Sequence, residues 1–388
     1  MLDKLIYLDH NSTTPPDPRV IKAMLPYYTE AWGNASSLHQ FGRHAKAGIE
    51  EAREIIAGAF NCLPEEIFFT SGGTESDNFA VKGTAYEHRS KGRHIITSKI
   101  EHHAILESFA FLEEDGFEAT YLPVDKYGFV DPDDLRKAIR SDTILVSIMY
   151  ANNEVGTIQR MDELAWICAE KGVIFHSDAV QAAGKIPIDL KKTPISLMST
   201  SGHKIYGPKG VGILYVRQGT RIMRWQTGGH HERGLRAGTE NVPAIVGYGK
   251  AMGLARAEMR ENDRKISGMA EEFRRRVLAE IPDVRFNGPE NDRIKGTVSL
   301  CFKGAEGEAI ILNLDMTGIG VTSGSACTSG ALEPSHVLTA MGVPPELAQS
   351  AIRFSFGKDN DPGDIDYIIN SLKAAIEKLR MMSPFYQS

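Results

Sequence analysis

Three features of the sequence could together bind one phosphorylated cofactor. Ser71-Gly72-Gly73-Thr74 follows a strand-like run and opens a helical pattern, so its backbone N–H groups would lie at a helix N-terminus, where a phosphate binds favourably. Asp178 ends a second strand-like run, at the sheet edge where α/β proteins bind ligands. Lys204 follows a third run, in a loop rich in glycine. Each feature alone has an ordinary structural interpretation, as a capped turn, a helix cap or a solvated lysine.

Taken together, these features are what a pyridoxal phosphate enzyme must supply. Backbone N–H groups hold the phosphate, a lysine forms a Schiff base with the aldehyde, and a carboxylate keeps the pyridine nitrogen protonated. His102, just beyond the strand-like run 94–98, could stack on the ring. The glycine-rich turn matches neither a Walker loop nor a dinucleotide fingerprint, which disfavours a nucleoside triphosphate or a nicotinamide cofactor.

Two further residues stand out by their surroundings. Cys327 lies in a loop of Gly, Ser and Thr, whereas a free cysteine is usually buried as a small apolar residue. This loop favours a nucleophile over an inert surface thiol. Arg353 lies in the apolar run 351–356 and needs an anion, either a substrate carboxylate or an internal Asp or Glu. The other three cysteines lie in apolar or helical contexts, and no spacing indicates a zinc site or a disulfide framework: Cys62, Cys168 and Cys301.

Composition limits the class of protein. The chain has 388 residues, of which 42% are hydrophobic and 24% charged, as in an ordinary globular protein. A net charge of −6 without a basic block gives no reason to expect nucleic acid or an anionic membrane as a partner. No apolar run reaches the roughly 18 residues of a membrane span, and the N-terminal run is too short for a signal peptide. We therefore expect a cytoplasmic protein with a small-molecule ligand.

The elements that must position these residues follow from the alternation of strand-like and helical patterns. The expected strands are 66–70, 94–98, 120–124, 144–149, 173–176, 195–200 and 211–216, and the helices between them are 74–88, 102–115, 131–139 and 160–171. This order predicts a mainly parallel α/β sheet with helices on its faces. An amphipathic helix is expected upstream, over 41–60.

A long charged helix over 244–281 is predicted to lead out of this sheet into a second unit. That unit contains a strand over 297–302, a helix over 306–315, a strand near 319–322, the cysteine loop and a final amphipathic helix from Ile365 to Leu379. We expect a large cofactor-binding domain over 15–260, and a small domain formed by 1–14 and 261–388 that carries the cysteine loop.

With these residues in view, the chain resembles the cysteine desulfurases, which are class V, fold type I pyridoxal phosphate enzymes. It is most similar to the group that serves iron–sulfur cluster and nitrogenase-type cofactor assembly. The similarity extends along nearly the whole chain and is most specific over Ser201–Gly210, Arg233–Asn241 and Ser323–Ser329. It implies an α/β fold with a large domain built on a mainly parallel seven-stranded sheet and a small α+β domain. The chain departs from the familiar pattern at Ala35, where a proline is usual, and at His10 and His230.

The resemblance also implies a role for each candidate residue. Lys204 is the Schiff-base lysine, Asp178 pairs with the pyridine nitrogen, His102 stacks on the ring and Gln181 contacts the ring hydroxyl. The phosphate is held by Gly73, Thr74, Ser201 and His203, with Thr239 reaching in from the second subunit of a homodimer. The substrate carboxylate is oriented by Asn34, Asn153 and Arg353, and Cys327 accepts the sulfur on a mobile loop.

The same resemblance implies that the chain converts L-cysteine to L-alanine and forms a persulfide on Cys327. The sulfur would then pass to an acceptor protein, such as an iron–sulfur scaffold, and a cluster could be bound transiently at Cys327. Two alternatives remain open. One is an aminotransferase or selenocysteine lyase on the same fold, for which Cys327 is less necessary. The other is a non-catalytic sulfur carrier or assembly scaffold. The sequence does not name the acceptor.

Overall fold

A seven-stranded sheet forms the larger part of the computed structural model, which describes residues 4–324, 334–383 and 386. Its strand order is β2-β8-β7-β6-β5-β3-β4. The strands are β2 (Ile67–Thr70), β3 (His94–Ser98), β4 (Glu118–Leu122), β5 (Thr143–Ser147), β6 (Ile174–Asp178), β7 (Leu197–Ser201) and β8 (Gly212–Val216). Only β8 runs antiparallel to its neighbours, β2 and β7. The mainly parallel sheet predicted over this region is therefore confirmed.

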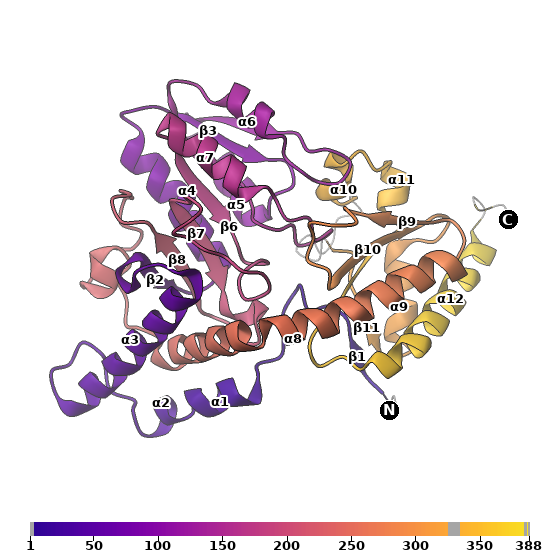
Figure 1. The fold of residues 1–388 in the computed structure, drawn as a ribbon, viewed down its shortest axis with the longest axis horizontal. Coiled ribbons are helices and arrows are strands. Elements are labelled where there is room, and N and C mark those ends of the chain that lie inside the picture. The colour runs from indigo at the N-terminus through magenta and orange to yellow at the C-terminus, as the bar shows by residue number, and fades with distance from the viewer. Residues whose placement is uncertain (1–3, 325–333, 384–385, 387–388) are drawn as a thin grey trace.

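Helices cover both faces of this sheet (Figure 1). They are α4 (Gly73–His88), α5 (His103–Glu114), α6 (Pro132–Ala138) and α7 (Met161–Lys171), close to the predicted bounds. Neighbouring strand residues point to opposite faces. Accordingly, Ile95 packs in one core with α4 and α5, while Ile96 packs in another with α6 and α7. This arrangement buries the strands on both sides and leaves their ends for ligands.

Two long helices cross the lower part of the molecule (Figure 1). The amphipathic helix α3 (Gln40–Phe60) packs against the first half of α8 (Val242–Glu280), close to the short helices α1 (Pro18–Met24) and α2 (Pro26–Thr29). The second half of α8 belongs to a different core, which contains Phe273 and Val277. The predicted domain boundary at residue 260 falls inside α8, between the Met252 of one core and the Met269 of the other, and it stays a prediction.

The second unit combines two small sheets with helices. A three-stranded antiparallel sheet has the order β12-β10-β9, and β1 pairs with β11 in a parallel pair. These strands are β1 (Ile6–Tyr7), β9 (Val284–Asn287), β10 (Thr297–Phe302), β11 (Ile319–Gly320) and β12 (Ala351–Ser355). The helices are α9 (Gly307–Asp315), α10 (His336–Ala340), α11 (Pro345–Ala348) and α12 (Ile365–Met382). Because β1 pairs with β11, residues 9–14, which follow β1, lie at the junction of the two units.

Within the part of the chain that the structure describes, no helix combines the length and the apolar character that crossing a membrane requires.

Candidate active site

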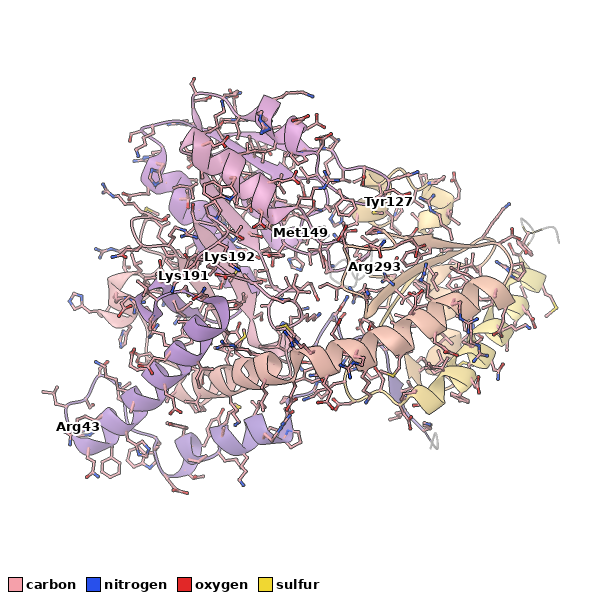
Figure 2. All side chains as sticks on the ribbon, viewed as in Figure 1. Arg43, Tyr127, Met149, Lys191, Lys192 and Arg293 are labelled. Carbon is pink, nitrogen blue, oxygen red and sulfur yellow. The ribbon has the colours of Figure 1, made fainter. Side chains whose placement is uncertain are left out.

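The candidate site is a cavity of about 330 Å³ at the carboxyl ends of the strands of the large sheet. Its lining includes most of the residues that the sequence singled out: Gly73, Thr74, His102, Asn153, Asp178, Gln181, Ser201, His203, Lys204 and Arg353. Arg353 comes from β12, so the second unit closes one side. Figure 2 shows Met149, another lining residue, on the side of the large sheet that faces this unit, with Lys191 and Lys192 farther away.

One end of the cavity is suited to a phosphate. Gly73 begins α4, where backbone N–H groups point outward, and Ser201 ends β7 beside it. A Cβ atom at Gly73 would lie 2.8 Å from Val180 Cγ2, so the absent side chain leaves room that any other residue would fill. Burial and the nearby charge of Lys204 lower the pKa of His203 to about 4, which makes its ring a neutral hydrogen-bonding group at pH 7.

The cavity also presents a buried carboxylate. Asp178 is the last residue of β6, and its Oδ1 accepts a hydrogen bond from the Val180 N–H at 2.9 Å. Burial raises its pKa, whereas the hydrogen bond from the Val180 N–H and the charge of Lys204 act to lower it. Asp77 of α4 lines the same cavity, and its buried Oδ1 has no hydrogen-bond partner among the described residues. A buried carboxylate of this kind can accept a hydrogen bond from the protonated ring nitrogen of a bound cofactor.

His102 precedes α5 as its N-cap residue, and its Nδ1 accepts a hydrogen bond from the Ala104 N–H at 3.1 Å. This bond fixes the plane of the ring at the cavity wall. Burial and the charge of Lys204 lower the pKa of His102, against the opposing effect of Asp178, so the neutral ring is favoured. A neutral, oriented imidazole can stack on an aromatic cofactor.

Lys204 lies in a short 3₁₀ turn after β7, and its ammonium reaches the N-terminal segment. Its Nζ donates to the carbonyl oxygens of Asn11 at 2.6 Å and Ser12 at 2.8 Å. The Asn11 carbonyl also accepts from Gln181 Nε2 at 2.9 Å. The segment that follows β1 therefore holds both Lys204 and Gln181 in position.

Arg353 is buried and already bound inside the chain. Its Nη2 lies 2.7 Å from Asp9 Oδ1 and 2.7 Å from Ser12 Oγ, and its Nη1 donates to the Asn153 carbonyl at 3.0 Å. Its Nε has no partner among the described residues. The structure thus contains the internal acidic partner that the sequence left open, while the side chain still lines the cavity, and the role of Arg353 toward a substrate stays a prediction.

Cys327 lies outside the described residues, but the chain on both sides of residues 325–333 meets the cavity. Gly324 and His336 line it, and Ser335 Oγ donates to the cavity residue Glu154 at 2.5 Å. Of the remaining cysteines, Cys168 and Cys301 are buried and Cys62 is partly so. Burial raises the pKa of each of these thiols, in Cys62 to about 12, so they are protonated at neutral pH and poor nucleophiles.

Two predicted site residues lie away from this cavity. Asn34 is exposed and accepts a hydrogen bond from the Ser36 N–H at 2.8 Å. It lines a different pocket, together with Thr239, and that pocket shares no residue with the cavity of Lys204. The roles of both residues toward the cofactor and substrate remain predictions.

Sequence reasoning missed four residues that shape the site: Asn11, Ser12, Asp77 and Lys185. The polar run Asp9 to Thr14 directly after β1 was a usable signal for the first two, because polar residues that follow a strand often face a ligand. No local signal marks Asp77 or Lys185, since each lies in an ordinary helical or turn context.

Comparison with known proteins gives a consistent result. The family model described as "Aminotransferase class-V" matches residues 6–368. The chain is 52% identical to "Cysteine desulfurase IscS" of Dictyoglomus turgidum, covering 98% of this chain and 97% of that protein. It is 51% identical to the protein of the same name from Methanosarcina thermophila, covering 98% and 94% respectively.

Solved structures agree. A protein titled "NIFS-LIKE PROTEIN" superposes with a TM-score of 0.91 at 39% identity, covering 97% of this chain and 100% of that one. A structure titled "SspA in complex with cysteine" gives a TM-score of 0.82 at 33% identity, covering 91% and 99%. The cavity offers a phosphate cradle, a buried carboxylate and a lysine, which fit pyridoxal phosphate. This chain therefore belongs to the class-V aminotransferase family and, within it, to the pyridoxal-phosphate-dependent cysteine desulfurases.

Proposed function

We propose that this chain removes sulfur from L-cysteine, releases L-alanine and retains the sulfur as a persulfide on Cys327. The observation that carries the proposal is the cavity itself. Lys204 and Asp178 line it together, and Gly324, shortly before Cys327 in the chain, lies at the same cavity. The structure titled with bound cysteine, at 33% identity, supports the choice of substrate.

The predicted site residues that line the cavity each have a role in this proposal. When bound, pyridoxal phosphate supplies an electron-accepting ring next to the substrate Cα. Gly73, Thr74, Ser201 and His203 would hold its phosphate. Asp178 would keep a proton on its ring nitrogen, His102 would stack on the ring and Gln181 would contact the ring oxygen. Lys204 would attach the cofactor and, as an amine, would take the proton from the substrate Cα.

Substrate binding falls to polar groups at the junction of the two units. Arg353 and Asn153 lie together, joined by the bond from Arg353 Nη1 to the Asn153 carbonyl at 3.0 Å. We assign the substrate carboxylate to this pair because a planar guanidinium binds a carboxylate through two parallel hydrogen bonds.

The sulfur step needs no outside oxidant. The Cys327 thiolate attacks the sulfur of the substrate, an S–S bond forms and the substrate Cβ–S bond breaks. The electron pair of the broken bond stays with the carbon fragment, which takes up protons and leaves as L-alanine. L-Cysteine and one thiol thus give L-alanine and one persulfide.

The test is mass spectrometry of the purified holoenzyme after incubation with L-cysteine, with an alanine assay of the supernatant. We expect an added sulfur on the peptide that contains Cys327, together with released alanine. Cys327→Ser should keep the cofactor spectrum and lose sulfide release, whereas Cys62→Ser serves as the matched control and should retain both. Full activity in Cys327→Ser, or alanine without a persulfide, would overturn the assignment and favour a lyase or an aminotransferase.

A homodimer would complete the site, as we infer from the positions of Asn34 and Thr239. These residues line one pocket apart from the cavity of Lys204, so each would serve the cavity of a partner subunit. The adjoining segment exposes large apolar side chains, which a second copy of this chain would cover: Tyr28, Trp32, Leu38 and Phe41 are exposed by 60%, 67%, 90% and 53%.

The persulfide is proposed to pass to an acceptor protein of iron–sulfur cluster assembly. A sulfur that must first be taken from the substrate and then be given to a second protein requires a carrier that can move between the two. Transfer of ³⁵S from labelled L-cysteine to a purified cluster scaffold, lost in Cys327→Ser, tests this step. Retention of the label on Cys327 in the presence of the scaffold would argue for another acceptor.

A further inference from the structure

Lys185 is a partly buried lysine that touches residues of the cavity without lining it. It faces a neighbouring crevice of about 100 Å³, which shares Asn11 and Lys204 with the cavity. Its Nζ donates to Gln181 Oε1 at 2.7 Å and to Asn11 Oδ1 at 3.2 Å. Among the described residues, no carboxylate oxygen lies within 4.0 Å of this nitrogen.

A cation with only amide oxygens around it is costly in this setting. Burial, with the positive charges of Lys204 and Arg353, lowers the pKa of Lys185 to about 7. His10 and His203 also face it, but burial lowers the pKa of each to about 4, so both are neutral above pH 6. The group that would balance this positive charge is an anion bound in the cavity.

The contacts of Lys185 also determine which way the Gln181 amide points. The structure turns the Gln181 amide oxygen toward Lys185, whose Nζ donates to it, and below about pH 7 Lys185 is an ammonium that can only donate. On its other side, Gln181 Nε2 donates to the Asn11 carbonyl at 2.9 Å, which can only accept. Because one Nε2 hydrogen is used there, the second N–H is the group that Gln181 can offer to the cavity it lines.

We propose that Lys185 is a positioning residue, which holds the Gln181 oxygen away from the cavity so that the amide N–H faces the ring oxygen of the cofactor and stabilises it in the ionised form. This inference rests on the proposed function, because it takes Gln181 as the contact of the ring oxygen. Without Lys185, the amide is held at one side only, and below about pH 7, where Lys185 is charged, a positive charge beside the cavity is lost as well. Both changes make the ring oxygen bind a proton more tightly.

The test is a pH titration of the absorbance of the bound cofactor in the holoenzyme, between pH 6 and pH 10. Lys185→Met is expected to raise the apparent pKa of the absorbance change by about one unit, a tenfold change. Lys185→Arg, which can still only donate, should restore most of the wild-type value. Lys191→Met is the matched control, since this lysine is exposed and lies away from the cavity, and it should leave the titration unchanged.

A double-mutant cycle separates positioning from simple charge. If Lys185 acts through Gln181, the double variant Gln181→Ala with Lys185→Met shifts the apparent pKa by less than the sum of the two single shifts. Additive shifts, or no shift in Lys185→Met, would overturn the proposal. If Lys185→Met does not fold, Lys185→Gln takes its place in the cycle, with the same expected outcomes.

Failure of this inference is distinguishable from failure of the proposed function. In the first case, the wild-type holoenzyme forms its chromophore and desulfurates L-cysteine, but the apparent pKa of the absorbance change is the same in the wild type and in Lys185→Met. In the second case, the wild type itself transfers no sulfur to Cys327.

Discussion

Arg353 shows how one side chain can serve both the fold and the substrate. Its guanidinium is bound by Asp9 and by the Asn153 carbonyl, yet it lines the cavity. The pair with Asp9 places the planar group before any substrate arrives, which reduces the ordering that binding requires. The same contact provides an acidic competitor for the substrate carboxylate.

Arg353→Lys is expected to raise KM for L-cysteine at least about tenfold with a smaller change in kcat, because lysine keeps the charge for Asp9 but loses the two-pronged geometry. Steady-state kinetics with L-cysteine measure this. Arg285→Lys on β9, the opposite edge strand of the same sheet, is the control and should leave KM unchanged. An unchanged KM together with a lower thermal midpoint would make Arg353 purely an internal partner of Asp9.

Glu101 is a buried carboxyl beside the site that makes stability depend on pH. Its Oε1 accepts from Ser98 Oγ at 2.5 Å and from the Met149 N–H at 3.0 Å, while its Oε2 has no partner among the described residues. Burial raises its pKa to about 8. The native state therefore keeps this proton up to about pH 8, whereas the unfolded chain releases it near pH 4.5, so rising pH favours the unfolded state.

Glu101→Gln removes this titration. Between pH 5 and pH 8, the free energy of unfolding of the variant should improve relative to the wild type by about 3 kcal/mol, the size expected for such a displaced pKa. Urea unfolding of the apoprotein at several pH values measures this difference. Stability curves that stay parallel across this range would show that Glu101 does not titrate there.

At the level of elements, the first turn of α4 carries the phosphate prediction. Gly73 packs against Val180, whose branched side chain has little freedom to move aside. Gly73→Ala is expected to weaken cofactor binding at least about tenfold while the fold is kept, because the new methyl group narrows the cradle. Titration of the apoprotein with pyridoxal phosphate, followed by fluorescence, gives the dissociation constant.

Two further variants identify the cause. Val180→Ala combined with Gly73→Ala should recover most of the affinity, because it removes the atom that the methyl group meets at 2.8 Å. Gly268→Ala in the exposed part of α8 meets nothing within 4 Å and should leave binding unchanged. Unaltered binding in Gly73→Ala would place the phosphate elsewhere.

At the scale of the whole molecule, the apolar face around Trp32 and Leu38 predicts association. Trp32 stacks on Phe41 at 5.6 Å between ring centroids, which makes a rigid exposed surface. Trp32→Asp with Leu38→Asp should convert a dimer into monomers in sedimentation velocity and weaken cofactor binding, because Thr239 of the partner is lost.

Trp166→Asp is the control for this prediction, since that tryptophan is 54% exposed on α7, away from the face. It should leave the dimer intact. A wild-type protein that sediments as a monomer at micromolar concentration, with the cofactor tightly bound, would contradict the arrangement.

Much of the fold was predictable because it depends on local patterns. The strand β10 was predicted with its observed bounds, and α8 to within two residues at its N-terminus. Short apolar runs and helical periodicity indicate which face of a strand or helix is buried. These patterns extend over only a few neighbouring residues, so they can be found in the sequence alone. The pairing of Ile6 with Ile319 was missed, because the two-residue strand β1 carries no local signal and its partner is distant in sequence. The four-residue strand β9 was also missed.

The chemistry of the site divides in the same way. Sequence alone determined which residue types are present, and their positions after strand-like runs or in polar, glycine-rich loops singled out Lys204, Asp178 and Cys327 as candidates. Only the tertiary structure decided that Asp9 binds Arg353, that Asn11 joins Lys204 to Gln181 and that Lys185 faces an amide oxygen. These contacts join residues from different strands and loops across the junction of two units. Charge and hydrogen bonding act over a few ångströms in space, and no spacing along the chain encodes that proximity.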